Sequence, residues 1–219
     1  MRMVWITMAA VLTAMVYAAA SLALPQLLLF PHYEMVGQTP VYSAHPLPPA
    51  IRTIVGKADD RIRTSDLFTA DVRRRPIFLT DGGPRWRLLS LGAGGGFALT
   101  RPLGEAIVVN RSSIDTDRVF NGAPVGGERS LSGVIAHERT HVLIRQRFGP
   151  FADRIIPTWK VEGYCDHIAG GGSLTDAEAD RLRGANPASR ALFYHDARRR
   201  AEAVLAQNQG SSAALFARS

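Results

Sequence analysis

Cysteine is almost absent from this chain, since Cys165 is the only one among 219 residues. One copy of the chain therefore cannot form an internal disulfide, and an oxidising compartment would add no covalent cross-link to the fold. An unpaired cysteine is tolerated in such a compartment when its thiol is buried. We therefore expect Cys165 to lie in the core.

Lysine is nearly as scarce, because Lys57 and Lys160 are the only two, and the formal net charge of +7 comes almost wholly from arginine. The arginine runs at 73–75 and 198–200 could contact phosphate groups or an anionic lipid surface, but a solvated face is the favoured interpretation. No aromatic residues are interleaved with these runs, which argues against nucleic acid as a partner.

Charge is missing altogether from residues 3–30. Residues 3–24 are long enough to span a bilayer as a helix. No Lys or Arg follows Arg2 until Arg52, so the positive-inside rule leaves the short N-terminus in the cytoplasm and sends the rest of the chain across the membrane. We predict a single-pass anchor in the inner (cytoplasmic) membrane over residues 1–30, with the main domain on the periplasmic, extracytoplasmic side.

A cleaved secretory signal is the competing interpretation of this segment. Its apolar stretch would be Val4 to Val16, and the alanines at 18–20 would serve as the small-residue cleavage site. The apolar run continues past that site through "LALPQLLLF", which favours a retained anchor. Both interpretations export the domain.

The remaining chain predicts an α+β arrangement, with strands first and helices second. A connector covers residues 30–40 and a loose tail covers 209–219, so the folded domain is expected over 31–208. A glycine-rich stretch at 92–96 lacks the residues of a phosphate-binding loop and is interpreted as a mobile connection or cleft rim. Strands are predicted at 41–43 and 76–80 and within "WRLLSL", "FALT" and "EAIVVN"; helices are predicted at 48–62, 131–148, 158–169, 175–183 and 187–206.

Local signals mark several of these helix ends. Ser130, Thr175 and Asn186 stand where N-caps belong, and Glu178 completes a capping box with Thr175. Pro187 is suited to a first helical position. The glycines at 170–172 end the second of the late helices.

His137, Glu138 and His141 form an H-E-x-x-H motif inside an apolar helical run. Histidines four residues apart share a helix face and can bind one tetrahedral Zn²⁺. Glu138, beside the first histidine, can act as general base on a water that the metal activates. The alternative, three polar residues that happen to share a helix, leaves them without partners in a buried setting, which is costly.

The next predicted helix supplies further candidates in "PTWKVEGYCD". Glu162 can provide the third metal ligand that leaves a fourth position open for water. Asp166, one turn later, can accept the N–H of a ligand histidine and fix its tautomer. As a set, the two motifs favour a zinc site over a surface carboxylate at Glu162.

This combination resembles the gluzincin branch of the zincin metallopeptidases, and "W-x-x-E-G" around Glu162 is similar to the form in bacterial membrane-associated peptidase-MA-like domains. The resemblance covers residues 106–169. It implies His137, His141 and Glu162 as ligands, Glu138 as catalytic base and Asp166 as a supporting carboxylate. It also implies a zincin-like mixed sheet whose edge strand, "AIVVN", would hold an extended peptide beside the metal.

The predicted function is that of a zinc-dependent peptidase acting on polypeptides near the outer face of the inner membrane. The group that would stabilise the oxyanion stays open among Tyr194, His195 and His167, because spacing does not choose between them. The alternative is a non-catalytic, membrane-anchored zinc domain that binds a partner or stabilises an assembly. A weaker possibility is an anionic-surface binder with structural zinc. An open fourth coordination position would favour the peptidase.

Overall fold

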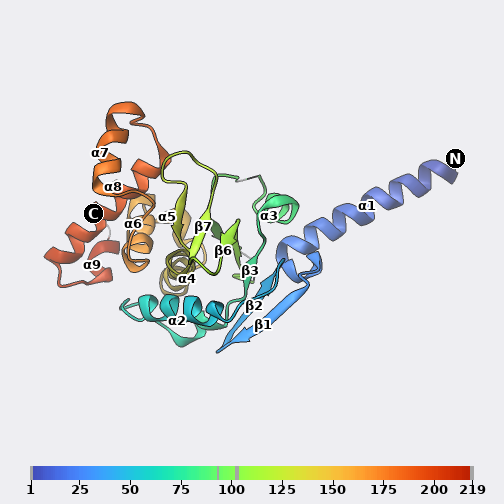
Figure 1. The fold of residues 1–219 in the computed structure, drawn as a ribbon, viewed down its shortest axis with the longest axis horizontal. Helices are drawn as coiled ribbons and strands as arrows, with labels where there is room; N and C mark the ends of the chain where they lie inside the picture. Colours follow the sequence, from blue (N-terminus) through green and yellow to red (C-terminus); the bar gives the residue numbers. More distant parts are fainter. Residues whose placement is uncertain (1, 93, 102–103, 218–219) are drawn as a thin grey trace.

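The computed structural model describes residues 2–92, 94–101 and 104–217. Met1, Ala93 and the last two residues, which belong to the predicted anchor, glycine stretch and tail, lie outside the described residues. Within the described part, the chain has a mixed α/β fold with a mixed five-stranded sheet and a small three-stranded sheet. One long N-terminal helix extends away from the body (Figure 1).

That helix, α1 (Arg2–Ala23), confirms the predicted apolar helix. Its segment Trp5–Ala23 is long and apolar enough to cross a membrane, with a mean hydropathy of 1.9, and almost none of it is buried in the body. A signal sequence can have the same length and apolar character. The structure therefore establishes an apolar helix that is long enough to span a membrane.

The five-stranded sheet has the order β1-β2-β3-β5-β4. Its parallel centre is β2, β3 and β5, and the edge strands β1 and β4 are antiparallel to their neighbours. The strands are β1 (His32–Val36), β2 (Thr39–Ser43), β3 (Ile77–Leu79), β4 (Ala98–Thr100) and β5 (Ile107–Val109). The prediction that "AIVVN" is an edge strand is wrong, because β5 has a partner on both sides and β4 occupies the edge.

Two further predictions in this region are wrong. Residues 30–40 are not a simple connector, because they form β1 and a tight turn at Gly37, where φ is +61°. "WRLLSL" is not a strand, because it lies mostly in helix α3 (Gly83–Leu89). Pro84 suits the first turn of that helix, and Trp86 and Leu89, three residues apart, are both buried on one face.

The sheet is covered on both faces, because successive strand residues point to opposite sides. Ile77 belongs to the main core with residues of α2 (Ala50–Ile62) and α4 (Leu131–Phe148). Phe78 belongs to a second cluster with Trp86 of α3, against which Phe30 of the segment 25–30 also packs. The segment that directly follows α1 therefore packs against the sheet.

A second sheet directly precedes α4, the helix that carries the H-E-x-x-H motif. It contains β6 (Ser112–Ser113), β7 (Arg118–Phe120) and β8 (Glu128–Ser130). None of these short strands was predicted. Strand β8 ends at Ser130, whose hydroxyl accepts a hydrogen bond from the Gly133 N–H, as expected of the predicted N-cap.

The helices predicted at 158–169 and 175–183 are present, whereas the helix predicted at 187–206 begins later and leaves Pro187 outside it. The capping box of Thr175 and Glu178 is present. Asn186 is not an N-cap, because the last of the predicted long helices begins after Ser189. The helices are α5 (Ala152–Ile155), α6 (Thr158–Ile168), α7 (Asp176–Ala185), α8 (Arg190–Gln207) and α9 (Ser212–Phe216), and single 3₁₀ turns lie at Pro25–Leu28 and Ala70–Arg74.

The prediction of a loose tail is wrong over residues 212–216, which form α9. Leu215 and Phe216 are buried. The backbone N–H of Ser212 donates to Asp66 at 3.0 Å, and the Phe216 ring contacts Tyr164 of α6. Burial of apolar side chains thus holds this short helix on the body.

Helices α6 and α8 approach closely at Gly163. A Cβ atom at this position would lie 2.3 Å from the carbonyl oxygen of Ala197 and 2.9 Å from the Cβ of Ala201. Only glycine allows this contact, which fixes α8 against the helix that carries Glu162. The glycine of "W-x-x-E-G" therefore has a packing role.

We expect Gly163→Ala to destabilise the protein by about 1–3 kcal/mol, because the added methyl group overpacks the contact between α6 and α8. Gly56→Ala in α2 is the matched control, since nothing lies within 4 Å of its added Cβ. That control should stabilise the protein by about 0.5–1 kcal/mol. Urea unfolding followed by circular dichroism measures both changes, and equal stability of the two variants would contradict the tight contact.

Candidate metal centre

Helix α4 presents the motif residues because its opposite side is held in the core. Arg139, between the motif residues, is fully buried and forms an ion pair with Asp59 of α2. Its guanidinium also donates to the Thr39 hydroxyl of β2 at 2.7 Å. A buried charge needs such partners, so these contacts fix the rotation of α4 and direct His137 and His141 to the other side.

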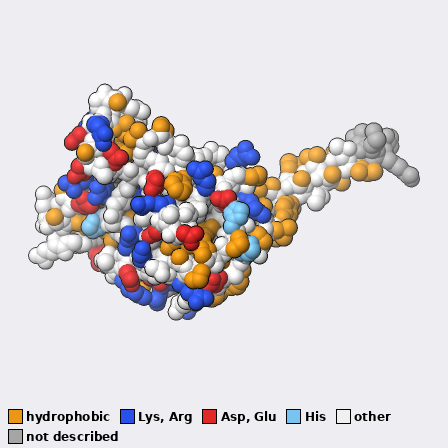
Figure 2. Space-filling model, viewed as in Figure 1, with side chains coloured by type: hydrophobic (Ala, Val, Ile, Leu, Met, Phe, Trp, Pro, Cys, Tyr) orange, Lys and Arg blue, Asp and Glu red, His pale blue; other side chains and the backbone are white. Residues whose placement is uncertain are grey.

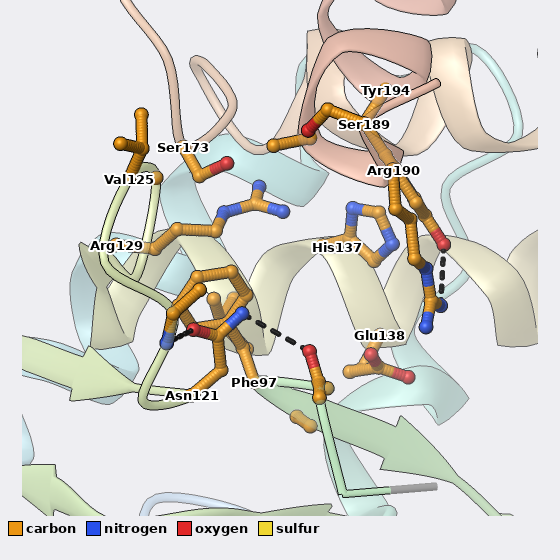
Figure 3. Close-up of a pocket in the computed structure, with 17 residues that line it drawn as sticks. Phe97, Asn121, Val125, Arg129, His137, Glu138, Ser173, Ser189, Arg190 and Tyr194 are labelled. Carbon is orange, nitrogen blue, oxygen red and sulfur yellow. Dashed lines mark hydrogen bonds between the residues drawn. The ribbon is translucent and has the colours of Figure 1, made fainter. Parts of the chain in front are cut away.

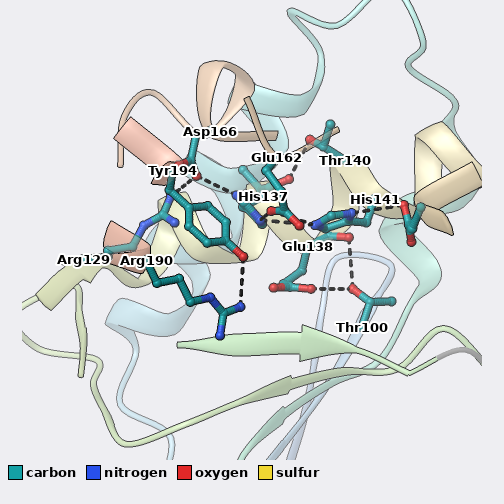
Figure 4. Close-up of polar contacts among 12 residues, drawn as sticks. Thr100, Arg129, His137, Glu138, Thr140, His141, Glu162, Asp166, Arg190 and Tyr194 are labelled. Atoms are coloured by element: carbon teal, nitrogen blue, oxygen red, sulfur yellow. Dashed lines mark hydrogen bonds and ion pairs between the residues drawn. The ribbon is translucent and has the colours of Figure 1, made fainter. Parts of the chain in front are cut away.

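Three potential ligand atoms converge beside α4 (Figure 4). The Nε2 atoms of His137 and His141 lie 3.2 Å apart. Glu162 of α6 places Oε2 3.3 Å from the first of these nitrogens and 3.7 Å from the second. Ligand atoms bound about 2.0–2.1 Å from a tetrahedral zinc lie about 3.3–3.4 Å from one another. The three atoms are therefore spaced as ligands of one small metal ion.

The other ring nitrogens face carboxylates. His137 Nδ1 lies 2.7 Å from Asp166 Oδ1, as predicted for this aspartate. His141 Nδ1 lies 3.3 Å from Asp153 Oδ1. An Nδ1–H that donates to a carboxylate leaves the Nε2 lone pair free for a metal. Two lone pairs and a carboxylate then face one another, and this arrangement suits a cation between them.

Charge in the site agrees with this requirement. Burial lowers the pKa of His137 and of His141, but other groups outweigh burial and both pKa values are raised: Asp166 and Glu162 act on His137, and Cys165, Glu162 and Asp153 act on His141. Burial raises the pKa of Glu162, yet the two histidines hold that pKa far below its usual value. Protons therefore compete with a metal ion for the histidine nitrogens, so we expect metal affinity to fall with falling pH.

Arginines hold both supporting carboxylates. Arg129 of β8 lies 2.7 Å from Asp166 and donates to the Gly171 carbonyl at 2.9 Å. Arg145 of α4 lies 2.6 Å from Asp153. Sequence reasoning missed Asp153, although an acidic residue in the connection between the two motifs was a signal for it. Nothing in the local sequence marked either arginine.

We expect Asp153→Asn to weaken metal binding by about 10- to 100-fold, because the amide no longer holds the His141 tautomer as a carboxylate does. Asp60→Asn, at an exposed position in α2 beside Arg63, is the control and should bind metal like the parent. Competition with a chromogenic zinc chelator measures the affinities. Unchanged affinity in Asp153→Asn would show that Asp153 does not support the ligand.

Cys165 adds a fourth donor near the site. It is buried, as predicted, and the ligand atoms of His137, His141 and Cys165 all lie within 4.8 Å of one another. This buried group could hold a metal ion. Burial raises the pKa of the Cys165 thiol to about 12, so the metal-free thiol is neutral, whereas Glu162 is ionised. The Oε2 atom of Glu162 lies 3.3 Å and 3.7 Å from the two nitrogens, and we therefore regard this ionised carboxylate as the better third ligand.

The carboxylate of Glu138 lies between the ligand cluster and the sheet edge. Its Oε2 atom is 2.8 Å from the Thr100 hydroxyl of β4, which is also 3.1 Å from the Glu138 carbonyl oxygen. Thr100 was not predicted as a site residue, because the two lie far apart in sequence. The edge strand β4 therefore orients the side chain of Glu138, which the motif predicts to be the catalytic base.

A cavity of about 320 Å³ opens beside His137 and Glu138 (Figure 3). Its walls come from residues of the β7–β8 loop and of the first turns of α8, and Phe97 and Ala98 line it next to β4. Gly95 and Gly96 also line it, which agrees with the predicted cleft rim. The lining is mainly apolar, with two cationic groups, Arg129 and Arg190.

The structure separates the three candidates for oxyanion stabilisation. Tyr194 lines the cavity, and its hydroxyl accepts a hydrogen bond from Arg190 at 2.9 Å. His195 is buried elsewhere, with Asp176 2.8 Å from its Nε2. His167 is largely exposed and lies near Glu202 at 3.8 Å. Tyr194 is therefore the candidate that shares a cavity with Glu138.

Comparisons with known proteins add no identification, because no family model, no curated protein and no solved structure matches this chain. The resemblance to the gluzincins therefore depends on the motif residues and on the geometry around them. What the described residues establish is a buried histidine cluster that could bind a metal ion, beside a cavity lined by Glu138 and Tyr194.

Proposed function

We propose that this chain is a zinc-dependent peptidase of the gluzincin type with a zincin-like fold. The observation that carries the proposal is the convergence of the ligand atoms of His137, His141 and Glu162 at 3.2–3.7 Å, beside the Glu138 carboxylate. The donor set of two imidazoles and one carboxylate fits zinc and leaves a position open for water. Three protein ligands with an open position are typical of catalytic sites.

Bound zinc would supply a Lewis acid that makes a coordinated water more acidic. Glu138 takes the proton from the attacking water and delivers it to the leaving amine. The Thr100 hydroxyl holds the Glu138 carboxylate in place at 2.8 Å. Tyr194, whose O–H can donate into the cavity, stabilises the negative charge that develops on the scissile carbonyl oxygen. Arg190 orients the Tyr194 ring through its hydrogen bond.

The substrate fits an extended polypeptide. Strand β4 pairs with β5 on one side only, so its outer edge can pair with a substrate strand. Ala98 and Thr100 are alternate residues of this strand: Ala98 lines the cavity that Glu138 also lines, and Thr100 lines a separate hollow beside Arg145 and Asp153. Backbone hydrogen bonds at this edge would bind a peptide with little dependence on its side chains. The apolar cavity would then favour peptides whose side chains fit it.

The enzyme would be held in the inner membrane by α1, with its body on the periplasmic side. The positive-inside rule supports this orientation, because Arg2 is the only cationic residue before Arg52. Helix α1 continues unbroken through the alanines at 18–20 that a signal peptidase would have to cleave. The Tyr17 hydroxyl also donates to the Leu27 carbonyl oxygen across that point. These features favour a retained anchor over a cleaved signal.

Metal removal tests the proposal. The full chain, purified in detergent, is stripped with a chelator, reloaded with zinc, analysed for bound metal and incubated with a broad peptide library. We expect one zinc per chain, peptide cleavage by the loaded protein and loss of cleavage in the stripped protein. Stoichiometric zinc without cleavage would contradict the peptidase and support a non-catalytic zinc domain. Absence of zinc would contradict the metal site itself.

A further inference from the structure

The last turn of α1 packs against the body of the protein. Every side chain from Trp5 to Tyr17 is exposed. Ser21 is fully buried, and Leu22 and Ala23 are partly covered. The part of α1 that stands free of the body is therefore shorter than the helix.

This free part is too short to cross a membrane by itself. The exposed residues 5–17 rise by about 20 Å in an α-helix, and counting from Arg2 extends this to about 24 Å. The hydrocarbon core of a bilayer is about 30 Å thick. A spanning α1 must therefore use residues 18–23 as well, and the protein surface packed around those residues is drawn to the lipid boundary.

Arg101 holds the end of α1 on the body, and Arg85 holds the segment that follows α1. Arg101 donates to the Leu22 carbonyl oxygen at 3.1 Å and to the Leu89 carbonyl oxygen at 2.8 Å. Arg85 donates to the carbonyl oxygens of residues 28 and 29, each at 3.1 Å. Carbonyl groups at a helix C-terminus lack intrahelical partners, and a cation there is stabilising. The contact from Arg101 therefore attaches the last turn of α1 to the body.

The surface around this junction has the composition of a membrane interface. Leu24, Leu29 and Leu91 are 55%, 78% and 67% exposed. Arg87, at the end of α3, is also exposed, and a cation there suits lipid phosphates. Hydrophobic side chains along α1 continue onto the body at its base (Figure 2). Helix α3 contacts α1, and Leu91 lies two residues beyond the end of α3.

The metal centre is linked to this junction through one strand. Arg101, which holds Leu22, follows Thr100 at the end of β4. Thr100 in turn holds the Glu138 carboxylate at 2.8 Å. The edge strand that would bind substrate therefore ends at the membrane helix.

We propose that the face formed by residues 21–30, α3 and Leu91 lies on the bilayer, so that β4 and the metal centre act on polypeptide segments close to the membrane surface. This inference rests on the proposed function for its substrate and on α1 as a retained anchor for its geometry. A soluble peptide far from the bilayer would meet the site less often than a chain that emerges beside it.

A quenching experiment tests the placement independently of catalysis. The full chain is labelled with an environment-sensitive fluorophore at Leu91→Cys or at Ala185→Cys, an exposed position at the end of α7. Helix α7 lies on the far side of the body from α1 (Figure 1). Both variants are reconstituted into vesicles of phosphatidylethanolamine and phosphatidylglycerol with a spin label near the headgroup. We expect at least severalfold stronger quenching at position 91. Equally weak quenching at both positions would overturn the proposal.

A substrate series tests the consequence. Single-pass proteins carry one cleavable sequence either about 5 or about 30 residues outside the membrane, a difference of up to roughly 80 Å of extended chain. We expect the near site to be cleaved about tenfold faster by the reconstituted parent, and neither site by Glu138→Gln. Equal or faster cleavage of the distant site would contradict membrane-proximal selection. Absence of any cleavage would contradict the proposed function, and the quenching result would still decide the placement.

Discussion

Replacing Glu138 by glutamine is expected to lower peptide hydrolysis by about 10²- to 10⁴-fold while zinc remains bound. The amide keeps the size of the side chain and can still contact the Thr100 hydroxyl, which lies 2.8 Å from Oε2 in the parent. It cannot accept the proton of the attacking water. The three converging ligand atoms belong to other residues, so the substitution of Glu138 should leave the metal affinity close to that of the parent.

Initial rates of cleavage, together with zinc analysis of the same samples, measure this effect. Glu128→Gln is the matched control, because Glu128 is exposed on β8 and pairs with Arg118. That variant should cleave like the parent. If Glu138→Gln cleaved at the parental rate, Glu138 would not be the base, and if it lost zinc, it would have to be counted as a ligand.

Replacing Glu162 by glutamine is the second large effect, and we expect zinc affinity to fall by more than about 100-fold. This exceeds the 10- to 100-fold loss that follows removal of a group that only orients a ligand. The reason is that Glu162 is the carboxylate nearest to both Nε2 atoms, at 3.3 Å and 3.7 Å. A neutral amide also removes the negative charge that offsets the metal ion. Chelator competition measures the affinity.

Cys165→Ala is the informative partner of this variant. The thiol belongs to the buried group with His137 and His141 that could bind a metal, so it competes with Glu162 for the role of third ligand. We expect Cys165→Ala to keep zinc affinity within a few fold of the parent. Loss of zinc in Cys165→Ala together with retention in Glu162→Gln would establish a His₂Cys site and remove the main support for the gluzincin assignment.

Local sequence was sufficient for the elements that carry the motif. The apolar spacing of 131–148 with the cap at Ser130 predicts α4, and helical periodicity alone places His137 above His141. Thr175 and Glu178 predict the start of α7 through contacts within one turn. In each case the interacting groups are three or four residues apart, so the chain needs no tertiary partner to specify them.

The strands predicted within "FALT" and "EAIVVN" are present as β4 and β5, but the order of the strands in the sheet lay beyond the sequence. Strands β4 and β5 have three residues each, and they exist because they pair with each other and, for β5, with β3. Three residues carry too little periodicity to distinguish an interior strand from an edge. The error at "AIVVN" follows from this, because only the pairing in space makes β4 the edge beside Glu138.

The amino-acid sequence by itself determined the apolar N-terminal helix, the helix with His137 and His141, and the helix with Glu162. Each is specified by the composition or spacing of residues close together in the chain. Only the tertiary structure decided that Asp153 supports His141, that Thr100 holds Glu138, and that Tyr194 faces the cavity. These partners come from separate elements, and their distances depend on how the helices and the sheet pack, which no local pattern records.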